Sequence, residues 1–405
     1  MTFRELILRH GGTVAFGYGL ALCSSFGQTF FIALSGPGIR ESFGLSHGGF
    51  GAIYSVATLC SGLLMIWAGG VLDRVSTEVY AAVAVGGLAL AALGLSLAPG
   101  VAIVAVSLFA LRLFGQGMLG HASVTSTARL PQAIRGRAIG IATLGFSTGE
   151  MVLPGLALAI IAGAGWTGVW QVVASVLTVA FGLILAKAIR RGRTADSDPV
   201  RRTGPAVPSM PQRRRDVIRD WRFLVLIPSM IAPGAIGTGY FFHQRLIGEQ
   251  VGWGLDEIAL GFATYAGTAL VSTMTAGMVV DRFRGVRVAP FYLVFLGLAS
   301  LTLAYWPGGP PAMAFFALLA MTAAANSVVV PAVLAEIYGT EKLGTIRALA
   351  GAIMVVGSAT TPVLFGVLFD AGVTVGSIGI ASAVYVVVVS VLNSLLFRQP
   401  GVNPN

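Results

Sequence analysis

The stretch GGVLDR, residues 69–74, ends one long apolar run, and GMVVDR, residues 277–282, ends another one half a chain later. Both stretches follow the pattern Gly-x-x-x-Asp-Arg, formed by Gly69, Asp73 and Arg74 in the first copy and by Gly277, Asp281 and Arg282 in the second. The same offset along the chain joins two further pairs, Gly149 with Gly357 and Pro154 with Pro362. Landmarks repeated at one fixed spacing indicate a duplicated half.

The composition places these repeats in a membrane. The chain has 405 residues, of which 56% are hydrophobic and only 10% charged, and its mean hydropathy is +0.84. Soluble domains carry about 25% charged residues, so the surplus apolar surface must face lipid. A spanning helix needs about 20 apolar residues. Twelve such segments can be counted, near 13–36, 48–72, 78–98, 101–126, 138–162, 166–189, 222–245, 256–280, 288–306, 312–335, 346–369 and 374–397. They predict an all-α membrane protein with twelve transmembrane helices.

The basic residues predict the orientation. With the N-terminus in the cytoplasm, all but three of the 26 Lys and Arg residues fall on the cytoplasmic side; Arg40 and Arg245 lie outside, and Arg112 lies within a segment. This asymmetry is typical of an integral membrane protein with both termini cytoplasmic, in a bacterial-type inner membrane. The net charge of +10 is therefore interpreted as a topology signal and not as a nucleic-acid surface.

The domain organisation follows from the repeat. Residues 1–189 are expected to form one six-helix half and residues 222–405 the other. Residues 190–221 between them are rich in Arg, Pro and polar residues and predict a flexible cytoplasmic linker. Its basic clusters are suited to anionic lipid headgroups, so membrane lipids are expected partners.

On these motifs the chain resembles the major facilitator superfamily over nearly its whole length. The family motif after the second helix, Gly-x-Leu-Ala-Asp-Arg-x-Gly-Arg-Arg, is matched at Gly69, Leu72, Asp73 and Arg74, and departs from the family at Ser76 and the two residues after it. The resemblance implies two six-helix halves around a central cavity and a secondary transporter that works as a monomer.

The resemblance also implies a role for the repeated motif. In the family such residues form a conformational latch between the halves on the cytoplasmic side. Gly69 and Gly277 would let another helix approach closely. Asp73 and Asp281 would accept from basic residues or a helix N-terminus. The expected partners are Arg129, Arg135 and Arg137 in the first half, and Lys342 and Arg347 in the second, with Glu336 as a further member.

Two charges near mid-membrane stand out, Arg112 and Glu150. A charge at a helix centre costs about 2.5–3.5 kcal/mol on insertion scales, so such residues usually pair or face a cavity. Both lie about twelve residues into adjacent helices, and we expect them to pair or to approach each other across the cavity. Gln116 shares the helical face of Arg112, and Gln28 marks a polar stripe on the first helix. The alternative is a fixed Arg–Glu pair that only holds two helices together.

The second half offers fewer polar candidates. Asn326 lies midway along the tenth segment, and His243 lies near the outer end of the seventh, where it can equally be an interfacial side chain. The four histidines and two cysteines show no metal-ligand spacing. Neither a catalytic cluster nor an ATP-binding loop is recognised, so we expect a transporter without cofactor and not an enzyme.

These residues predict proton-coupled transport of a small organic solute, a carboxylate or other organic anion, because Arg presents a charged fork to an anion. Glu150 would carry the coupling proton. The alternative is proton-driven efflux of drug-like hydrophobic compounds, with Arg112 and Glu150 serving the proton alone.

Overall fold

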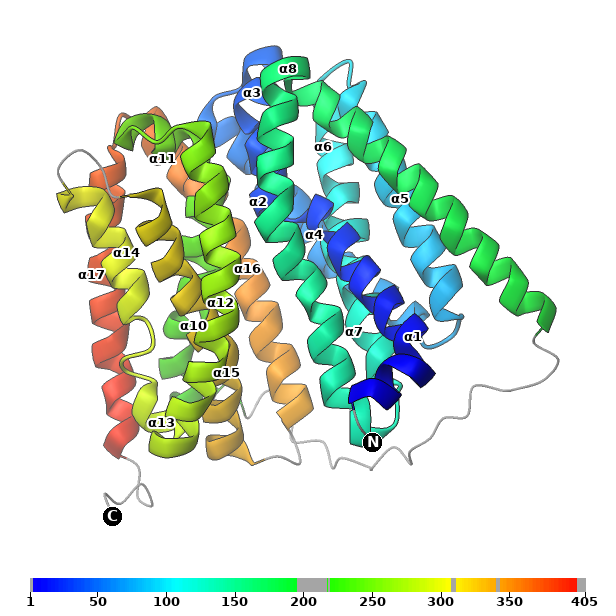
Figure 1. Cartoon of the computed structure of the whole chain (residues 1–405). Coiled ribbons are helices and arrows are strands. Elements are labelled where there is room, and N and C mark those ends of the chain that lie inside the picture. Colours follow the sequence, from blue (N-terminus) through cyan, green and yellow to red (C-terminus); the bar gives the residue numbers. More distant parts are fainter. Residues whose placement is uncertain (1–2, 195–216, 218, 307–310, 340–342, 399–405) are drawn as a thin grey trace. The chain divides into compact units, whose positions relative to one another are not determined.

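The structure is a computed structural model and describes residues 3–194, 217, 219–306, 311–339 and 343–398. The described residues are almost entirely helical and contain no strand, which confirms the predicted all-α fold class (Figure 1). In chain order the helices are α1 (Phe3–Ser24), η1 (Ser25–Gly27), α2 (Thr29–Ile32), η2 (Ala33–Ser35), α3 (Gly36–Phe43), α4 (His47–Val71), α5 (Thr77–Ser96), α6 (Val101–Ala110), η3 (Leu111–Leu119), α7 (Gly120–Ala128), α8 (Gln132–Thr194), α10 (Trp221–Phe242), α11 (Gln244–Val251), α12 (Leu255–Phe283), α13 (Gly285–Val288), α14 (Val294–Tyr305), α15 (Ala312–Tyr338), α16 (Leu343–Asp370), α17 (Val375–Ser394) and η4 (Leu395–Arg398).

The chain folds into two compact units. Unit 1 comprises Met1–Leu45 and Ile53–Ala206, and unit 2 comprises Ser46–Ala52 and Val207–Asn405. Within unit 1, α8 packs along α1 and α5; within unit 2, α12 packs on α15, α10 on α16 and α14 on α17. The first turns of α4 thus pack in unit 2 and the rest of that helix in unit 1. Most of the linker expected at 190–221 lies outside the described residues, so its flexibility stays a prediction.

Nine helices in the described part of the chain are long and apolar enough to cross a membrane, or ten if the bent first pair is one span. The fifth and sixth predicted segments lie together in α8, which leaves helical geometry at Gly165 (φ 69°, ψ −179°). Because glycine tolerates positive φ, the chain can turn there between two spans. The ninth segment contains the shorter α14, and the total of twelve spans stays a prediction.

The first predicted segment is not one helix. The expected run over 13–36 is broken at Gln28, whose backbone is extended (φ −87°, ψ 154°), and the pieces before and after it are bent by 45°. Broken helices at membrane depth are tolerated where protein or a water-lined cavity satisfies the freed backbone groups. The break therefore marks a place where unit 1 supplies partners to α1 and α2.

The ninth predicted segment begins later than expected. Residues 289–293 form turns before α14, and Pro290 lies among them. Proline lacks the N–H that a continuous helix would use. The freed carbonyl of Ala289 accepts from Asn393 Nδ2 at 3.1 Å, and Tyr292 Oη donates to the Ser229 carbonyl at 2.6 Å. Asn393 thus compensates for the break, whereas Tyr292 serves the Ser229 carbonyl of α10, which lacks its helical partner because Pro233 has no N–H.

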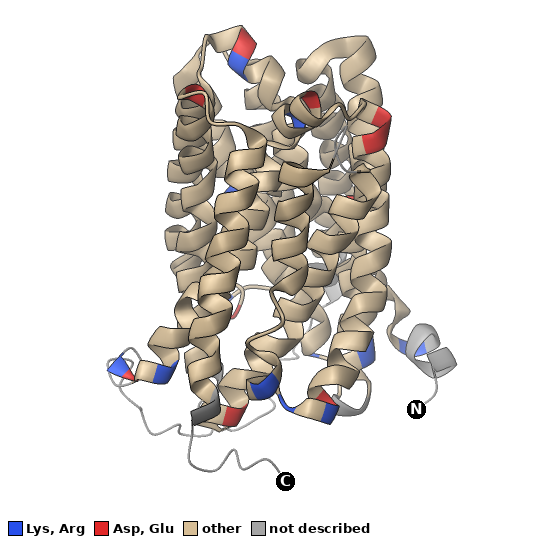
Figure 2. Ribbon diagram, turned by 90° about the vertical axis from the view of Figure 1, so that its left-hand side faces the viewer, with Lys and Arg blue, Asp and Glu red and all other residues tan. Residues whose placement is uncertain are grey.

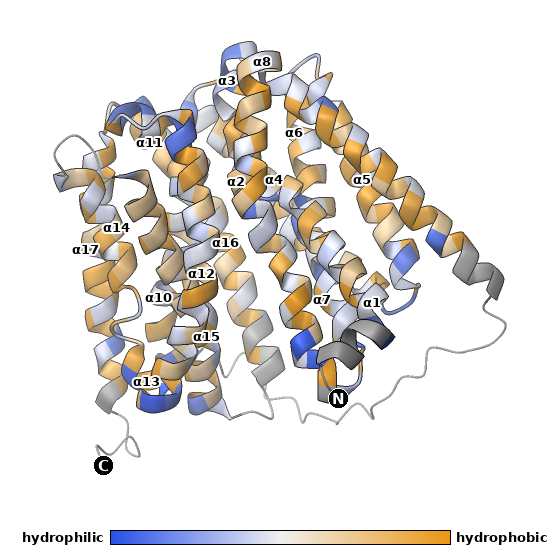
Figure 3. Ribbon diagram, viewed as in Figure 1, coloured by the Kyte–Doolittle hydropathy of each residue, from blue (hydrophilic) through white to orange (hydrophobic). Residues whose placement is uncertain are grey.

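Charge and hydropathy follow the helices in each unit. Hydrophobic residues dominate the middle of the helices (Figure 3). Lys and Arg gather mainly at one end, which is the end of the N-terminus in unit 1 and of the C-terminus in unit 2 (Figure 2). This distribution and the apolar spans fit an integral membrane protein.

Candidate functional site

A π-helix carries the buried arginine of unit 1. Residues Leu111–Leu119 form this wider helix between α6 and α7, and such turns are frequent at functional sites. Gly115 lies in the π-helix against Gly27 of η1, so closely that a Cβ on Gly27 would fall 2.7 Å from the Cα of Gly115. Only glycine permits this backbone contact, which holds the broken first helix against the segment that carries Arg112.

The guanidinium of Arg112 is held by one of its nitrogens. Nη1 donates to the Gly27 carbonyl at 3.3 Å and to Thr29 Oγ1 at 3.4 Å. The Cζ atom lies 5.3 Å from the centroid of the Tyr54 ring, a cation–π distance. Thr29 Oγ1 and Tyr54 Oη lie 2.7 Å apart. Both ends of the helix break thus contribute to orienting a side chain that is only 7% exposed.

The other edge of the guanidinium makes no bond to the described residues. Arg112 Nε is buried without a hydrogen-bond partner, and the bonds of the side chain to the described protein leave from Nη1. Among the described residues, no carboxylate forms an ion pair with Arg112. The Nε–Nη2 edge is one of the two edges with which arginine binds a carboxylate bidentately.

Glu150 lies on α8, which packs on α1 in unit 1. The direct ion pair with Arg112 is absent from the described residues, and an approach of the two side chains across a cavity stays a prediction. Its neighbour Gly149 touches Ser25, whose Cβ would lie 2.8 Å from a Cβ on the glycine, and Ser25 Oγ is buried without a partner. Nearby, Tyr18 Oη donates to Thr148 Oγ1 at 2.8 Å. Glu150 therefore leaves the charge of Arg112 unneutralised.

The two glutamines expected near this site differ in burial. Gln28 is half-buried at the helix break, whereas Gln116 is exposed on the π-helix. Thr29 and Tyr54, which contact Arg112 or its partners, were not recognised from the sequence. The polar stripe around Gln28 was the only signal near Thr29, and Tyr54 stands inside an apolar run where nothing distinguishes it from a core residue.

The candidates in unit 2 lie in two environments. Asn326 is half-buried in α15, and its Oδ1 is buried without a hydrogen-bond partner. His243 is 4% exposed, and its Nε2 lies 3.0 Å from the Pro362 carbonyl. Its ring packs against Phe369 at a centroid distance of 5.1 Å, and its expected place near the outer end of the membrane span stays a prediction.

The first copy of the repeated motif is bound by Arg129 within unit 1. Arg129 at the end of α7 donates to the Leu72 carbonyl and to Thr77 Oγ1, both at 2.9 Å, and lies 3.8 Å from the Asp73 carboxylate. Of the three expected partners of Asp73, the structure thus places Arg129 beside it. Arg135 instead donates to the Leu130 carbonyl at 3.2 Å.

The segment that follows the second copy of the motif is bound by a carboxylate, whereas the first copy is bound by an arginine. Glu336 at the end of α15 accepts from the backbone N–H of Gly285 at 2.6 Å and of Val286 at 3.1 Å, and lies 3.9 Å from Arg284 Nε. Asp281 itself is exposed, and Arg282 lies over the Phe283 ring at 5.6 Å. Of the expected partners of Asp281, Lys342 and the side chain of Arg347 lie outside the described residues.

The motif glycines have open surroundings among the described residues, and their close helix contacts in a latch stay a prediction. A Cβ on Gly277 would meet nothing described within 4 Å, and one on Gly69 would meet only Met65 and His121 at 3.5 Å or more. Arg74 is likewise exposed.

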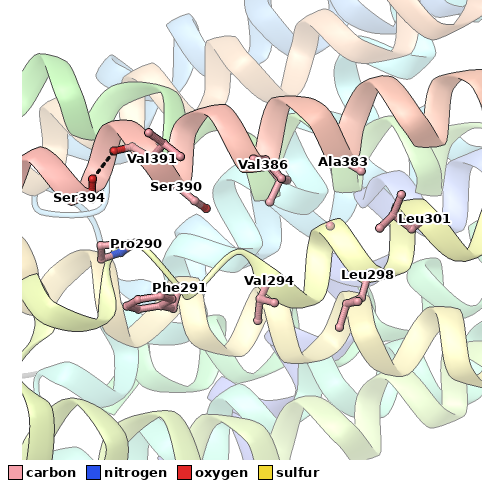
Figure 4. Close-up of a pocket in the computed structure, with 12 residues that line it drawn as sticks. Pro290, Phe291, Val294, Leu298, Leu301, Ala383, Val386, Ser390, Val391 and Ser394 are labelled. Atoms are coloured by element: carbon pink, nitrogen blue, oxygen red, sulfur yellow. Dashed lines mark hydrogen bonds between the residues drawn. The ribbon is translucent and has the colours of Figure 1, made fainter.

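An apolar groove of about 450 Å³ lies between α14 and α17 in unit 2 (Figure 4). Its lining combines valine and leucine side chains with Phe291 and the hydroxyls of Ser390 and Ser394. No charged residue lines it, so it offers nothing that would orient an anion. The polar candidates of unit 2, Asn326 and His243, do not line it either.

Comparison with known proteins concerns the family and the fold. The family model described as Major Facilitator Superfamily matches the chain twice, over residues 17–246 and 229–405. A solved bacterial homologue of the human lysosomal transporter Spinster, in an inward-facing and occupied conformation, is 15% identical with a TM-score of 0.69, covering 98% of this chain and 97% of that chain. Its inward-facing and unoccupied conformation is 17% identical with a TM-score of 0.66, covering 96% and 97%. No curated protein matches the chain.

Proposed function

The chain belongs to the major facilitator superfamily, and on that premise we propose that it moves a small organic anion, a carboxylate, across the membrane in a proton-coupled cycle. Membership makes the chain an integral membrane protein and a secondary transporter of the alternating-access class, not an enzyme. The substrate class, the coupling ion and the residues that serve them are the proposal.

One observation carries the choice of an anion. Arg112 is buried in unit 1 and has no acidic partner among the described residues, although a buried charge usually has one. Its Nη1 atom is bound to Gly27 and Thr29, and its buried Nε has no partner among the described residues. A planar carboxylate matches the Nε–Nη2 edge with two parallel hydrogen bonds. A neutral sugar or a hydrophobic cation would leave the charge unpaired.

Glu150 is assigned the coupling proton in this proposal. Its carboxylate lies within the membrane-spanning part of α8 and makes no ion pair with a described residue. Because Glu150 does not neutralise Arg112, substrate binding and proton binding can be removed separately by mutation. Gln28, Gln116, Asn326 and His243 remain proposed contributors to the substrate path.

The decisive experiment is uptake by proteoliposomes of radiolabelled carboxylates, sugars and cationic dyes, with and without a pH gradient. We expect uptake of at least one carboxylate by the wild type and its loss in Arg112→Gln. Arg9→Gln is the matched control, because it removes a positive charge from an exposed side chain away from the site. Dye movement without carboxylate uptake would contradict the anion proposal and favour the efflux alternative.

The coupling role has its own test in the same vesicles. We expect an inward proton gradient to stimulate carboxylate uptake by the wild type and not by Glu150→Gln. Counterflow without a gradient should persist in this variant, because the anion site is left intact. Gradient stimulation that survives in Glu150→Gln would assign the coupling proton to another group.

The latch and the topology are also part of the proposal. Gly69, Asp73 and Arg74, with Gly277, Asp281 and Arg282, are proposed to act at the cytoplasmic ends of the two halves of a monomer whose termini are both cytoplasmic. The gathering of Lys and Arg at these helix ends supports this orientation (Figure 2). Labelling of cysteines placed at Asp281 and at Glu41, in intact cells with an impermeant maleimide, should react at Glu41 only.

A further inference from the structure

Asp370, the last residue of α16, binds the first turn of α4. Its Oδ1 accepts from the backbone N–H of His47 at 2.9 Å, and its Oδ2 accepts from the backbone N–H of Gly48 at 2.7 Å. Both bonds lie inside unit 2, to which Ser46–Ala52 belongs. A carboxylate at this position satisfies N–H groups that have no partner within their own helix and suits the positive end of the helix dipole.

Three glycines make the surrounding contact unusually close. A Cβ on Gly51 would fall 2.7 Å from the carbonyl carbon of Pro362, and a Cβ on Gly366 would fall 2.8 Å from the Cα of Gly48. A Cβ on Gly48 would meet the Val367 side chain at 2.9 Å. The two helices therefore touch largely through backbone at the crossing point, where the Val367 side chain packs against Gly48.

Aromatic rings close the remaining sides of this contact. Phe50 stacks on Phe242 with centroids 5.1 Å apart, and the His47 and His243 rings lie 6.1 Å apart. Phe50 is 2% exposed. Within Ser46–Ala52, Gly48, Phe50 and Gly51 are thus buried, whereas Ser46 is exposed.

The same helix then continues into the other unit. From Ile53 onward α4 packs in unit 1, and Tyr54 there lies under Arg112. The helix runs from His47 to Val71 as one α-helix. Any movement of one unit against the other must therefore either bend α4 or release its first two turns from unit 2.

We propose that Asp370 is a releasable clasp, a positioning residue that holds the first two turns of α4 in unit 2 and lets them go during each transport cycle. The contact has the properties that release requires. The two N–H groups belong to a first helical turn, so water can replace the carboxylate without breaking the helix. At the glycine crossing the two backbones can separate directly, and Phe50, stacked on Phe242, is a buried side chain that must move with the segment. The inference rests on alternating access and is independent of the substrate proposed above.

The first test uses hydrogen exchange and needs no substrate. In purified protein in nanodiscs, we expect Asp370→Ala to speed exchange of the peptide that covers 46–52 by about tenfold. Glu336→Ala is the matched control, because Glu336 caps the first turn of α13 in the same way. It should speed exchange at 285–288 and leave 46–52 unchanged. Unchanged exchange of 46–52 in Asp370→Ala would refute the clasp.

Release itself is tested in the wild type. If the clasp opens without unfolding, the 46–52 peptide exchanges faster than the peptide covering 362–370 of α16. Equal protection of the two peptides would mean that the contact opens only when unit 2 unfolds, and the proposal would be wrong. This outcome says nothing against an anion substrate, so the two proposals fail separately.

A disulfide adds a functional readout. In a background with Cys23 and Cys60 changed to alanine, Gly48→Cys with Val367→Cys replaces the pair of positions whose side chains would meet first. Oxidation should arrest uptake of whichever compound of the carboxylate, sugar and dye panel the wild type transports, and a reductant should restore it. A merely structural contact would tolerate the lock, so full uptake by the oxidised protein would overturn the proposal.

Discussion

Gly27 and Gly115 meet backbone to backbone, with the amide nitrogen of Gln116 2.8 Å from where a Cβ on Gly27 would stand. This contact joins the break in the first helix to the π-helix that carries Arg112. The carbonyl of Gly27, bared at the break, then accepts from Arg112 Nη1 at 3.3 Å. The anion site proposed for this transporter therefore depends on two residues that have no side chains.

Gly115→Ala should damage both stability and transport. The new methyl group would meet the Gly27 Cα at 2.7 Å, and overpacking of this kind costs about 1–3 kcal/mol. Gly140→Ala is the control, since a Cβ there meets nothing described within 4 Å. We expect a lower apparent Tm in detergent for Gly115→Ala and an unchanged or higher one for Gly140→Ala. Equal Tm values would show that the crossing can relax.

Thr29→Val should weaken carboxylate binding without unfolding the protein. Valine keeps the shape of threonine but removes the oxygen that accepts from Arg112 and lies 2.7 Å from Tyr54 Oη. We expect KM for the carboxylate to rise about tenfold, the effect of one hydrogen bond to a charged group, with little change in maximal rate. Tyr54→Phe keeps the ring beneath Arg112 and should show a smaller rise. A rate effect with constant KM would contradict a binding role.

Asp73→Asn and Arg129→Gln should separate the latch from local stability. The Asp73 side chain is 82% exposed and 3.8 Å from Arg129, and exposed ion pairs contribute about 0–1 kcal/mol. Arg129 also makes two hydrogen bonds at 2.9 Å, so Arg129→Gln should lower the apparent Tm more. If Asp73 acts in a latch, Asp73→Asn will reduce uptake severalfold at nearly unchanged Tm. Unchanged uptake by Asp73→Asn would show that Asp73 has no role in a latch.

Asp220 gives unit 2 a pH-dependent stability with a defined sign. Asp220 Oδ1 accepts from the Arg222 backbone N–H at 2.9 Å, and its Oδ2 lies 2.9 Å from Arg222 Nη2. Burial raises the pKa of the Asp220 carboxyl, but the hydrogen bonds from Arg222 outweigh burial and hold that pKa below its usual range. The stabilisation is therefore fully present above about pH 4, the pKa of an unfolded aspartate, and is lost as the pH falls through the lower folded pKa.

The measurement is apparent Tm across pH for the wild type, Asp220→Ala and Asp220→Asn. Alanine removes both the helix cap and the charge, and we expect it to cost about 1 kcal/mol at pH 7. Asparagine can still cap and should cost less. The differences should be constant from about pH 8 to 5 and shrink below about pH 4. A difference that grows on acidification would contradict this assignment.

The positions of the helices could be predicted because lipid imposes a simple rule on composition. The apolar runs predicted the all-helical membrane fold, and the doubled Gly-x-x-x-Asp-Arg predicted the family that the comparison shows. Arg112 stood out for the same reason, since a charge within an apolar run is visible without any structure. The depth of such residues in the membrane was inferred from residue number along each helix, and it stays a prediction.

Direction around a helix and long-range partners could not be read in this way. Arg112 and Glu150 were assigned similar depths, but depth alone did not show that the Arg112 guanidinium bonds to Gly27 and Thr29 at the helix break and not to Glu150. The breaks at Gln28 and at 289–293 depend on Gly115 and Asn393, which are distant in sequence.

Asp370 shows most clearly the difference between what the sequence predicts and what packing decides. In the sequence, Asp370 is an acidic residue that follows an apolar run, as is common at the end of a membrane helix. Its bonds to His47 and Gly48 exist because helix ends separated by most of the chain are brought together when apolar faces pack. Local composition therefore decides which residues are helical and buried in lipid, whereas only packing in three dimensions decides which polar group meets which.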